Sequence, residues 1–253
     1  MSTNIPAVLE LEGVSMQFGS VQALTDINFT LRAGEVVGLV GDNGAGKSTL
    51  LKIITGYHKQ TSGTIRFDGR PVQFGSPAAA RALGIETVYQ DLALINEMTL
   101  WRNFFLGKEL SWFGGPVPLM RIAEMRRLTE QQLREIGLTH IQSADQFPAV
   151  LSGGERQSLA ITRAVFFGAR VLLLDEPTAA LSVKETRRVF TAIEAARQRG
   201  LGIIYIDHNM AHVHPIADRI VVVEHGRIAT SFERGDATIE QLMNFVAHGF
   251  TRE

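Results

Sequence analysis

Gly41-Asp42-Asn43-Gly44-Ala45-Gly46-Lys47-Ser48-Thr49 fits the phosphate-loop pattern G-x-x-x-x-G-K-[ST] at every fixed position. Residues 35–40 before it are apolar and rich in β-branched side chains, which is typical of a buried strand. Residues 49–54 after it have the pattern of a helix, closed by Gly56. Strand, loop and helix in this order predict a nucleotide phosphate site. The alternative, an ordinary glycine-rich turn that carries a lysine, is weakened by the flanking elements.

The residue types in this loop indicate how a phosphate would be held. Glycines let the backbone turn its N–H groups toward a phosphate chain, and the following helix adds the positive end of its dipole. Lys47 is expected to reach the β- and γ-phosphates, and the Ser48 hydroxyl is expected to bind Mg²⁺.

The composition is that of a globular protein without the overall charge of a nucleic-acid binder. Of the 253 residues, 45% are hydrophobic, which is enough for one large core or one core with a smaller lobe. The 25 basic and 26 acidic residues nearly cancel, so no nucleic-acid partner is expected. The absence of cysteine excludes a disulfide scaffold and zinc–thiolate sites.

The sequence also bears on location. The first residues have neither the basic start nor the apolar stretch of a secretory signal. No run approaches the roughly eighteen apolar residues that a membrane span needs. We therefore expect a protein of the cytosol whose membrane role, if any, comes through a partner.

The order of the predicted elements indicates an α/β fold. Residues 8–18 and 23–31 predict an antiparallel hairpin ahead of the phosphate loop. Residues 171–176, 202–206 and 220–223 predict apolar strands that alternate with amphipathic helices. This alternation predicts a mostly parallel sheet covered on both faces.

One segment departs from this alternation. Residues 91–150 predict a helical lobe inserted into the α/β core, with helices near 100–106 and 120–136.

Two carboxylates follow an apolar strand at Asp175-Glu176. The carboxyl ends of parallel strands form the edge where α/β proteins bind ligands, so Asp175 is placed to hold Mg²⁺, directly or through water. Glu176 would then polarise a water aimed at the γ-phosphate. The alternative is a pair of solvated carboxylates at a strand end, which the phosphate loop in the same chain disfavours.

Leu151-Ser152-Gly153-Gly154-Glu155-Arg156-Gln157 comes directly before another helical pattern. Small residues at a helix start make an anion site. Ser152 and Glu155 also fit a capping box, with or without phosphate. Because one ATP hardly needs a second anion site in the same chain, we infer that this segment completes the site on a second copy.

Some aromatic side chains are ambiguous on spacing alone. The position of Phe18 at the hairpin tip favours packing of its ring on the hairpin itself over stacking of the ring on adenine. His208 is a histidine at a strand end, where it could cap the following helix. His212 and His214 have the spacing of a metal pair, but ordinary packing is the favoured interpretation.

Taken together, these segments resemble a known family. Gly41–Thr49, Gln90, Leu151–Gln157, Val171–Glu176 and His208, in this order and spacing, are similar to the nucleotide-binding subunit of an ABC transporter. The resemblance covers nearly the whole chain and implies an α/β phosphate-loop NTPase cassette, with residues 1–253 as a single domain. Its mostly parallel sheet core is expected to carry an N-terminal antiparallel β subdomain and the inserted helical subdomain.

A narrower resemblance concerns the transported substrate. Residues 84–94, 177–181 and 208–210 resemble the ATPases of bacterial monosaccharide importers. A single cassette, as in the fructose-type importers, implies a homodimer. The implied partners are membrane permease subunits and, indirectly, a periplasmic or surface sugar-binding protein, with the ATPase on the cytoplasmic face of the membrane.

The resemblance also implies a role for each matching residue. It gives Phe18 the adenine stack, Gln90 the sensing of Mg²⁺ and of the attacking water, Asp175 the metal, Glu176 the general base and His208 the γ-phosphate contact. The implied ATP- and Mg²⁺-binding residues are Gly41, Asn43, Gly44, Ala45, Gly46, Lys47, Ser48 and Thr49, completed from the second copy by Ser152, Gly153, Gly154 and Glu155.

Two departures from the family pattern matter. Ser182 stands where the family commonly has aspartate, which puts the usual contact between the two sites in doubt. Glu155 stands where glutamine is common, a familiar variant in sugar ATPases.

Two alternatives stay open. The function is either that of an importer ATPase or that of a soluble ABC-type switch acting on nucleic acid or ribosomes, and the balanced charge favours the importer. The apolar patch of Trp101, Phe104, Phe105 and Leu106 is either a permease-docking groove or the core of the helical lobe.

Overall fold

The structure, a computed structural model, describes residues 6–89, 94–112 and 119–248. Its centre is a six-stranded sheet with the strand order β10-β9-β3-β8-β7-β6. All neighbours pair in parallel except β9 and β10, which form an antiparallel hairpin at one edge. The strands are β3 (Val36–Val40), β6 (Ile85–Val88), β7 (Val171–Asp175), β8 (Gly202–Ile206), β9 (Arg219–Glu224) and β10 (Arg227–Glu233).

A second sheet is antiparallel, with the order β2-β1-β4-β5. It contains β1 (Ala7–Phe18), β2 (Val21–Arg32), β4 (Ser62–Phe67) and β5 (Arg70–Val72). The predicted hairpin is confirmed by the pairing of β1 with β2. Strand β5 was not predicted, because it has only three residues. The Asp68-Gly69 pair before it is a hairpin signal in the sequence, and in the structure both residues have positive φ, +48° and +71°.

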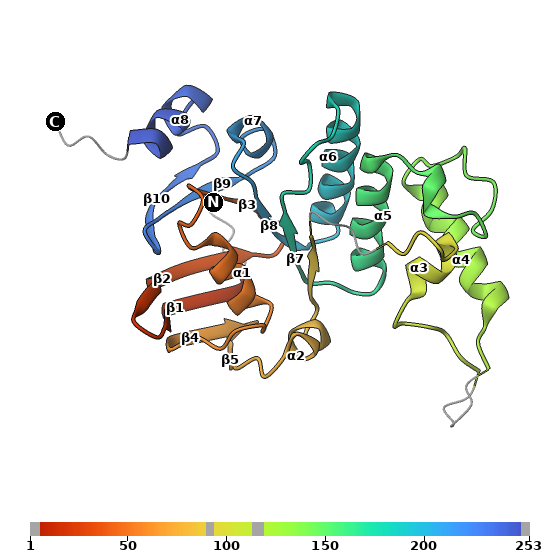
Figure 1. Cartoon of the computed structure of the whole chain (residues 1–253), viewed down its shortest axis with the longest axis horizontal. Coiled ribbons are helices and arrows are strands. Elements are labelled where there is room, and N and C mark those ends of the chain that lie inside the picture. The colour runs from red at the N-terminus through yellow and green to blue at the C-terminus, as the bar shows by residue number, and fades with distance from the viewer. Residues whose placement is uncertain (1–5, 90–93, 113–118, 249–253) are drawn as a thin grey trace.

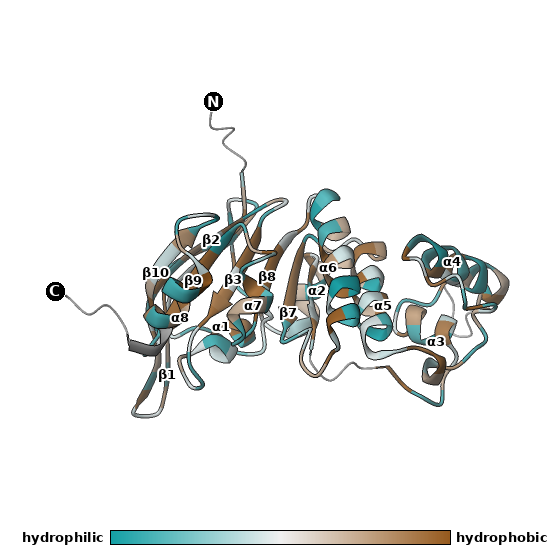
Figure 2. Ribbon diagram, turned by 90° about the horizontal axis from the view of Figure 1, so that it is seen from above, coloured by the Kyte–Doolittle hydropathy of each residue, from teal (hydrophilic) through white to brown (hydrophobic). Residues whose placement is uncertain are grey.

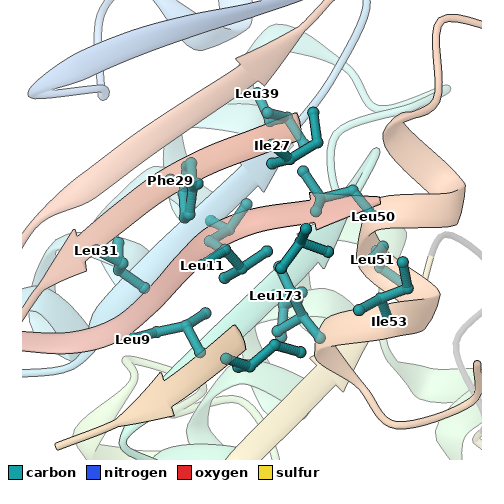
Figure 3. Packing of buried hydrophobic residues seen from close by; sticks show 14 of the residues in the cluster. Leu9, Leu11, Ile27, Phe29, Leu31, Leu39, Leu50, Leu51, Ile53 and Leu173 are labelled. Carbon is teal, nitrogen blue, oxygen red and sulfur yellow. The ribbon is translucent and has the colours of Figure 1, made fainter. Parts of the chain in front are cut away.

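Adjacent residues of a strand point to opposite faces of the sheet, and in the central sheet both faces are buried. One face packs against the antiparallel sheet and α1 (Lys47–Ile54), and Figure 3 shows this core. Apolar side chains of that core include Leu9, Leu11, Leu39, Leu50 and Leu173. The predicted two-sided cover is therefore confirmed, but a second sheet forms much of it on this face.

Helices cover the other face of the central sheet. They are α5 (Gly153–Phe166), α6 (Val183–Gln198), α7 (Met210–Val213) and α8 (Ile239–His248), and Figure 1 shows α5 and α6 side by side. Helix α2 (Pro77–Ala82) precedes β6 and is capped by the Ser76 hydroxyl. In Figure 2 the central strands are coloured mainly as hydrophobic.

Between β6 and α5 lie α3 (Leu100–Phe105), α4 (Ile122–Glu135) and a 3-10 turn, Pro148–Val150. These helices lie at the opposite end of the molecule from β1 and β2 (Figure 1). They form a core of their own, to which α5 contributes Leu159. The limits 91 and 150 of the inserted lobe stay a prediction, and Asp91 lies outside the described residues.

The apolar patch predicted in this lobe proves to be mostly core. Trp101, Phe104 and Phe105 are fully or almost fully buried, and only Leu106 is exposed, at 38%. Phe104 and Phe105 pack edge-on against the phenylalanines at the end of α5. The docking interpretation is therefore wrong for the first three residues, because a helix of six residues must bury its large side chains to be stable.

Candidate functional site

The phosphate loop joins the end of β3 to the start of α1. All three of its glycines have left-handed φ angles, +146° at Gly41, +84° at Gly44 and +113° at Gly46. At Gly41 a Cβ would lie 2.1 Å from the carbonyl oxygen of Val223, whereas at Gly44 nothing lies within 4 Å. The loop therefore packs closely on β9 at one end and is open where its backbone N–H groups would meet a phosphate.

Helix α1 begins at Lys47, two residues before the predicted start, as soon as the left-handed residue Gly46 has turned the chain. The Lys47 ammonium donates to the carbonyl oxygens of Gly41 (2.6 Å) and Asp42 (2.9 Å), so it lies over its own loop. Burial lowers the pKa of Lys47, and the negative charges of Glu176, Asp42 and Asp175 oppose that shift. A partly desolvated ammonium is well suited to receive a phosphate oxygen.

Glu176 follows the last residue of β7 in a strained backbone conformation. Its φ is +46°, which costs a non-glycine residue about 1–3 kcal/mol and is found mainly at functional sites. The Glu176 N–H donates to the carbonyl oxygen of Ile206, the last residue of β8 (2.8 Å). Beyond β8, Nδ1 of His208 lies 2.9 Å from Oε1 of Glu176. The sheet thus brings together two side chains that are 32 positions apart in the sequence.

The predicted loop and carboxylates share one cavity of about 160 Å³. It is lined by Asn43, Gly44, Gly46, Lys47, Ser48, Thr49, Asp175, Glu176 and Ile206. Burial raises the pKa of Asp175, the neighbouring Glu176 raises it further, and Lys47 counteracts both. Two carboxylates beside one ammonium leave a net negative charge in the cavity, which suits a cation bound together with a phosphate chain.

The donor set fits Mg²⁺ held together with nucleotide phosphates. Asp175 and Ser48 offer carboxylate and hydroxyl oxygens on the same cavity, and Mg²⁺ is commonly bound by one or two carboxylates plus substrate phosphates. Within residues 6–89, 94–112 and 119–248, no three His, Cys, Asp or Glu side chains are grouped to hold a metal ion by themselves.

The segment Ser152–Glu155 forms the start of α5. The Glu155 carboxylate accepts from the N–H of Ser152 (2.9 Å), as the predicted capping box requires. Among the residues that the structure describes, none of this segment lines the phosphate-loop cavity. The two predicted phosphate sites of one chain are thus not brought together.

Comparison with known proteins agrees with this geometry. A family model described as ABC transporter matches residues 24–179. The chain belongs to the ABC transporter family.

Three relatives illustrate where in the family it lies. The xylose/arabinose import ATP-binding protein of Sulfolobus acidocaldarius is 42% identical, over 93% of this chain and 92% of that protein. The fructose import ATP-binding protein of Rhizobium meliloti is 42% identical, over 94% and 93%. A ribose import ATP-binding protein of Chromobacterium violaceum is 41% identical, over 85% of this chain but only 42% of that protein.

Solved structures show the same fold. An ATP-binding subunit of an ABC transporter superposes with a TM-score of 0.74 at 26% identity, covering 95% of this chain and 99% of that one. A nucleotide-free ATP-binding cassette has a TM-score of 0.77 at 23% identity, with 95% of each chain covered. The predicted phosphate-loop NTPase cassette is thereby confirmed.

In this ABC transporter chain, the remaining residues considered for the site lie in different environments. The Phe18 ring is 42% exposed and meets the His58 ring edge-on, with centroids 5.2 Å apart. Gln90 lies outside the described residues. His212 and His214 contact different partners, Thr178 and the carbonyl oxygen of Ala237, which agrees with ordinary packing.

A buried polar cluster next to the Glu176 segment was not predicted from the sequence. The Thr178 hydroxyl lies 2.7 Å from the Tyr205 hydroxyl, 3.1 Å from Oδ2 of Asp207 and 3.0 Å from Nδ1 of His212. Burial raises the pKa of Tyr205, so its hydroxyl stays protonated. The cluster connects the chain after Glu176 to the chain around His208. Its only signal in the sequence is a tyrosine and an aspartate in an otherwise apolar strand end.

Another contact missed by sequence reasoning joins α5 to α6. Oε1 of Glu155 accepts a hydrogen bond from the guanidinium of Arg188, a residue in the second turn of α6. Nothing in the spacing of these residues distinguishes Arg188 from the neighbouring Arg187.

Proposed function

We propose that this chain is the ATP-hydrolysing subunit of an importer that moves a monosaccharide through a membrane permease. The observation that carries the proposal is one cavity lined by Lys47, Ser48, Asp175 and Glu176, in a chain that is 42% identical to two sugar-import ATP-binding proteins over nearly the full length of each. The names of these relatives also favour import over an action on nucleic acid or ribosomes.

Residues in and around the cavity have proposed tasks. The phosphate loop and Lys47 hold the phosphates of ATP, and Phe18 stacks on the adenine. Asp175 and Ser48 would hold Mg²⁺, whose positive charge would offset the negative charge of the phosphates. Glu176 accepts a proton from the attacking water. His208 keeps the Glu176 carboxylate in place, and His208 also contacts the γ-phosphate. We keep Gln90 as a further proposed ligand of the ion.

A second copy of the chain completes the site in this proposal. Ser152–Glu155 has a helix start that suits an anion, but it lies away from the cavity of its own chain. Closing it over ATP held by the other copy gives two nucleotides at one interface. ATP then holds the dimer together, and hydrolysis releases it.

The permease is proposed to dock beside α3. A cavity of about 280 Å³ there is lined by Arg81, Tyr89, Leu106 and Arg163, among others. Tyr89 and Leu106 are 48% and 38% exposed, unlike the buried Trp101. The chain would then work at the cytoplasmic face of the membrane, with a sugar-binding protein on the other side. No helix in the described part of the chain has the length and apolarity needed to cross a bilayer.

The test of the proposed function is the substitution Glu176→Gln. It keeps the shape of the side chain but removes the carboxylate that orients water, so it should block hydrolysis more than binding. We expect ATP affinity to be retained, turnover to be abolished and a stable dimer to accumulate with ATP, as measured by nucleotide binding, phosphate release and light scattering.

The matched control is Glu240→Gln in α8, an exposed carboxylate outside the site. It should hydrolyse ATP at the wild-type rate. Undiminished hydrolysis by the Glu176→Gln protein would refute the assignment of the base. For the permease, Leu106→Glu should reduce co-purification with the membrane subunits and leave ATP binding unchanged.

A further inference from the structure

The starts of α5 and α6 touch each other. A Cβ on Gly154 would lie 2.8 Å from Cβ of Glu185 and 2.9 Å from its carbonyl oxygen, so only glycine allows this approach. A Cβ on Gly153 would lie 2.7 Å from the Leu181 side chain. Figure 1 shows the two helices side by side. The segment proposed to meet the second copy's ATP therefore rests directly on the loop that follows Glu176.

Two carboxylates lie at this contact. Glu155 is only 6% exposed, and it accepts from the Ser152 N–H through Oε2. Glu185 accepts from the N–H (3.0 Å) and hydroxyl (2.8 Å) of Ser182, and Oε1 of Glu185 lies 3.5 Å from the Gly154 nitrogen. The Glu155 carboxylate thus accepts a hydrogen bond at the start of α5, and the Glu185 carboxylate of α6 lies against the same helix start, so both use part of the positive potential that a phosphate would need.

A single strongly basic side chain pairs with Glu155. Arg188 donates to Oε1 of Glu155, and in the described part of the chain no other arginine or lysine forms an ion pair with Glu155. The imidazole of His140 lies farther off, 3.7 Å from Oε2 of Glu155. A nearly buried carboxylate without such a partner is costly, and it would repel an arriving phosphate.

We infer that Arg188 is a positioning residue for the ATP-dependent dimer: it neutralises Glu155 and holds its carboxylate against Ser152, so that the α5 start can receive phosphate from the second copy. The inference rests on the proposed function, because it needs ATP to lie between two copies. Arg188 is not among the described residues that line the phosphate-loop cavity of its own chain, so its proposed role is to position Glu155 rather than to bind nucleotide there.

The test compares Arg188→Met in two backgrounds, with Glu155 and with Glu155→Gln. All proteins carry Glu176→Gln, so that hydrolysis does not interfere. The measured quantity is the ATP concentration at half-maximal dimer formation. With Glu155 present, Arg188→Met should raise this concentration by at least about tenfold, because a nearly buried charge loses its partner. With Glu155→Gln the same change should have little effect, because no charge is left to neutralise.

Two further proteins control the experiment. Arg188→Lys keeps a positive charge and should recover part of the loss. Arg187→Met removes the exposed neighbouring arginine, which forms no ion pair with any residue that the structure describes, and should leave the concentration unchanged. Thermal unfolding followed by circular dichroism verifies that each variant is folded.

The outcomes separate the two hypotheses. If the Glu176→Gln parent forms no dimer with ATP, the proposed function fails. If the parent dimerises and Arg188→Met dimerises at the same ATP concentration, the inference is overturned. It is also overturned if the Arg188→Met loss is equal in both backgrounds, because the arginine would then act through packing rather than through its charge.

Discussion

Nδ1 of His208 lies 2.9 Å from Oε1 of Glu176, which joins the chain beyond β8 to the chain beyond β7. An ionised carboxylate can only accept hydrogen bonds, so the imidazole donates from Nδ1. The contact restrains a glutamate that already has a strained backbone. His208 therefore bears on the orientation of Glu176, in addition to any contact with phosphate.

His208→Ala should lower kcat by about 100-fold or more, because a misplaced general base loses most of its effect. The KM for ATP should change little, since the phosphate loop keeps its own contacts. Steady-state phosphate release measures both constants. His225→Ala, which removes an exposed imidazole, is the control. A wild-type kcat in the His208→Ala protein would contradict the restraint.

Lys47→Met should weaken ATP binding by about 10- to 100-fold, because a charge-assisted hydrogen bond contributes roughly 1.5–3 kcal/mol. Lys52→Met removes an exposed ammonium from the same helix and should bind ATP normally. Isothermal titration calorimetry gives both affinities. Equal affinities for the two variants would show that Lys47 serves only to hold the loop.

Thr178→Val should lower the free energy of unfolding by about 1–3 kcal/mol, because the buried Tyr205 and Asp207 side chains lose a hydrogen-bond partner. Turnover should fall as well, since the cluster connects the Glu176 and His208 segments. Thr178→Ser keeps the hydroxyl and should retain most of the activity. Urea unfolding and phosphate release test this, and full activity in Thr178→Val would exclude a link to the site.

Glu185→Gln should change the pH dependence of stability. Hydrogen bonds from Ser182, above all from its backbone N–H, lower the pKa of Glu185 to about 2. A lowered pKa stabilises the fold above the unfolded-state value of 4.5, and this contribution is lost as the pH falls toward 2. The difference in unfolding free energy between wild type and Glu185→Gln should therefore be largest near neutral pH and should shrink below 4.5. A difference that is constant with pH would contradict the assignment. Glu240→Gln should show no such trend.

Local sequence was sufficient wherever a function depends on consecutive residues. The phosphate loop, the carboxylates after β7 and the cap of α5 are each formed within a few positions, so their residue types and spacing already determine their local geometry. The alternation of apolar strands and amphipathic helices likewise predicted the parallel sheet, because a strand that is buried on both faces is apolar at nearly every position.

Contacts between distant segments were decided only by the tertiary structure. Trp101 has the same apolar character whether it faces a partner or a core, and only packing buries it. Thr178 contacts Tyr205 because β8 pairs with β7. Arg188 and Glu155, which are 33 positions apart along the chain, meet because α5 and α6 lie in contact. The sequence by itself therefore determined the phosphate-loop motif Gly41–Thr49 and, with it, the prediction of a nucleotide phosphate site. The tertiary structure decided which side chains restrain Glu176 and which charge balances Glu155, because these depend on distances that spacing along the chain does not encode.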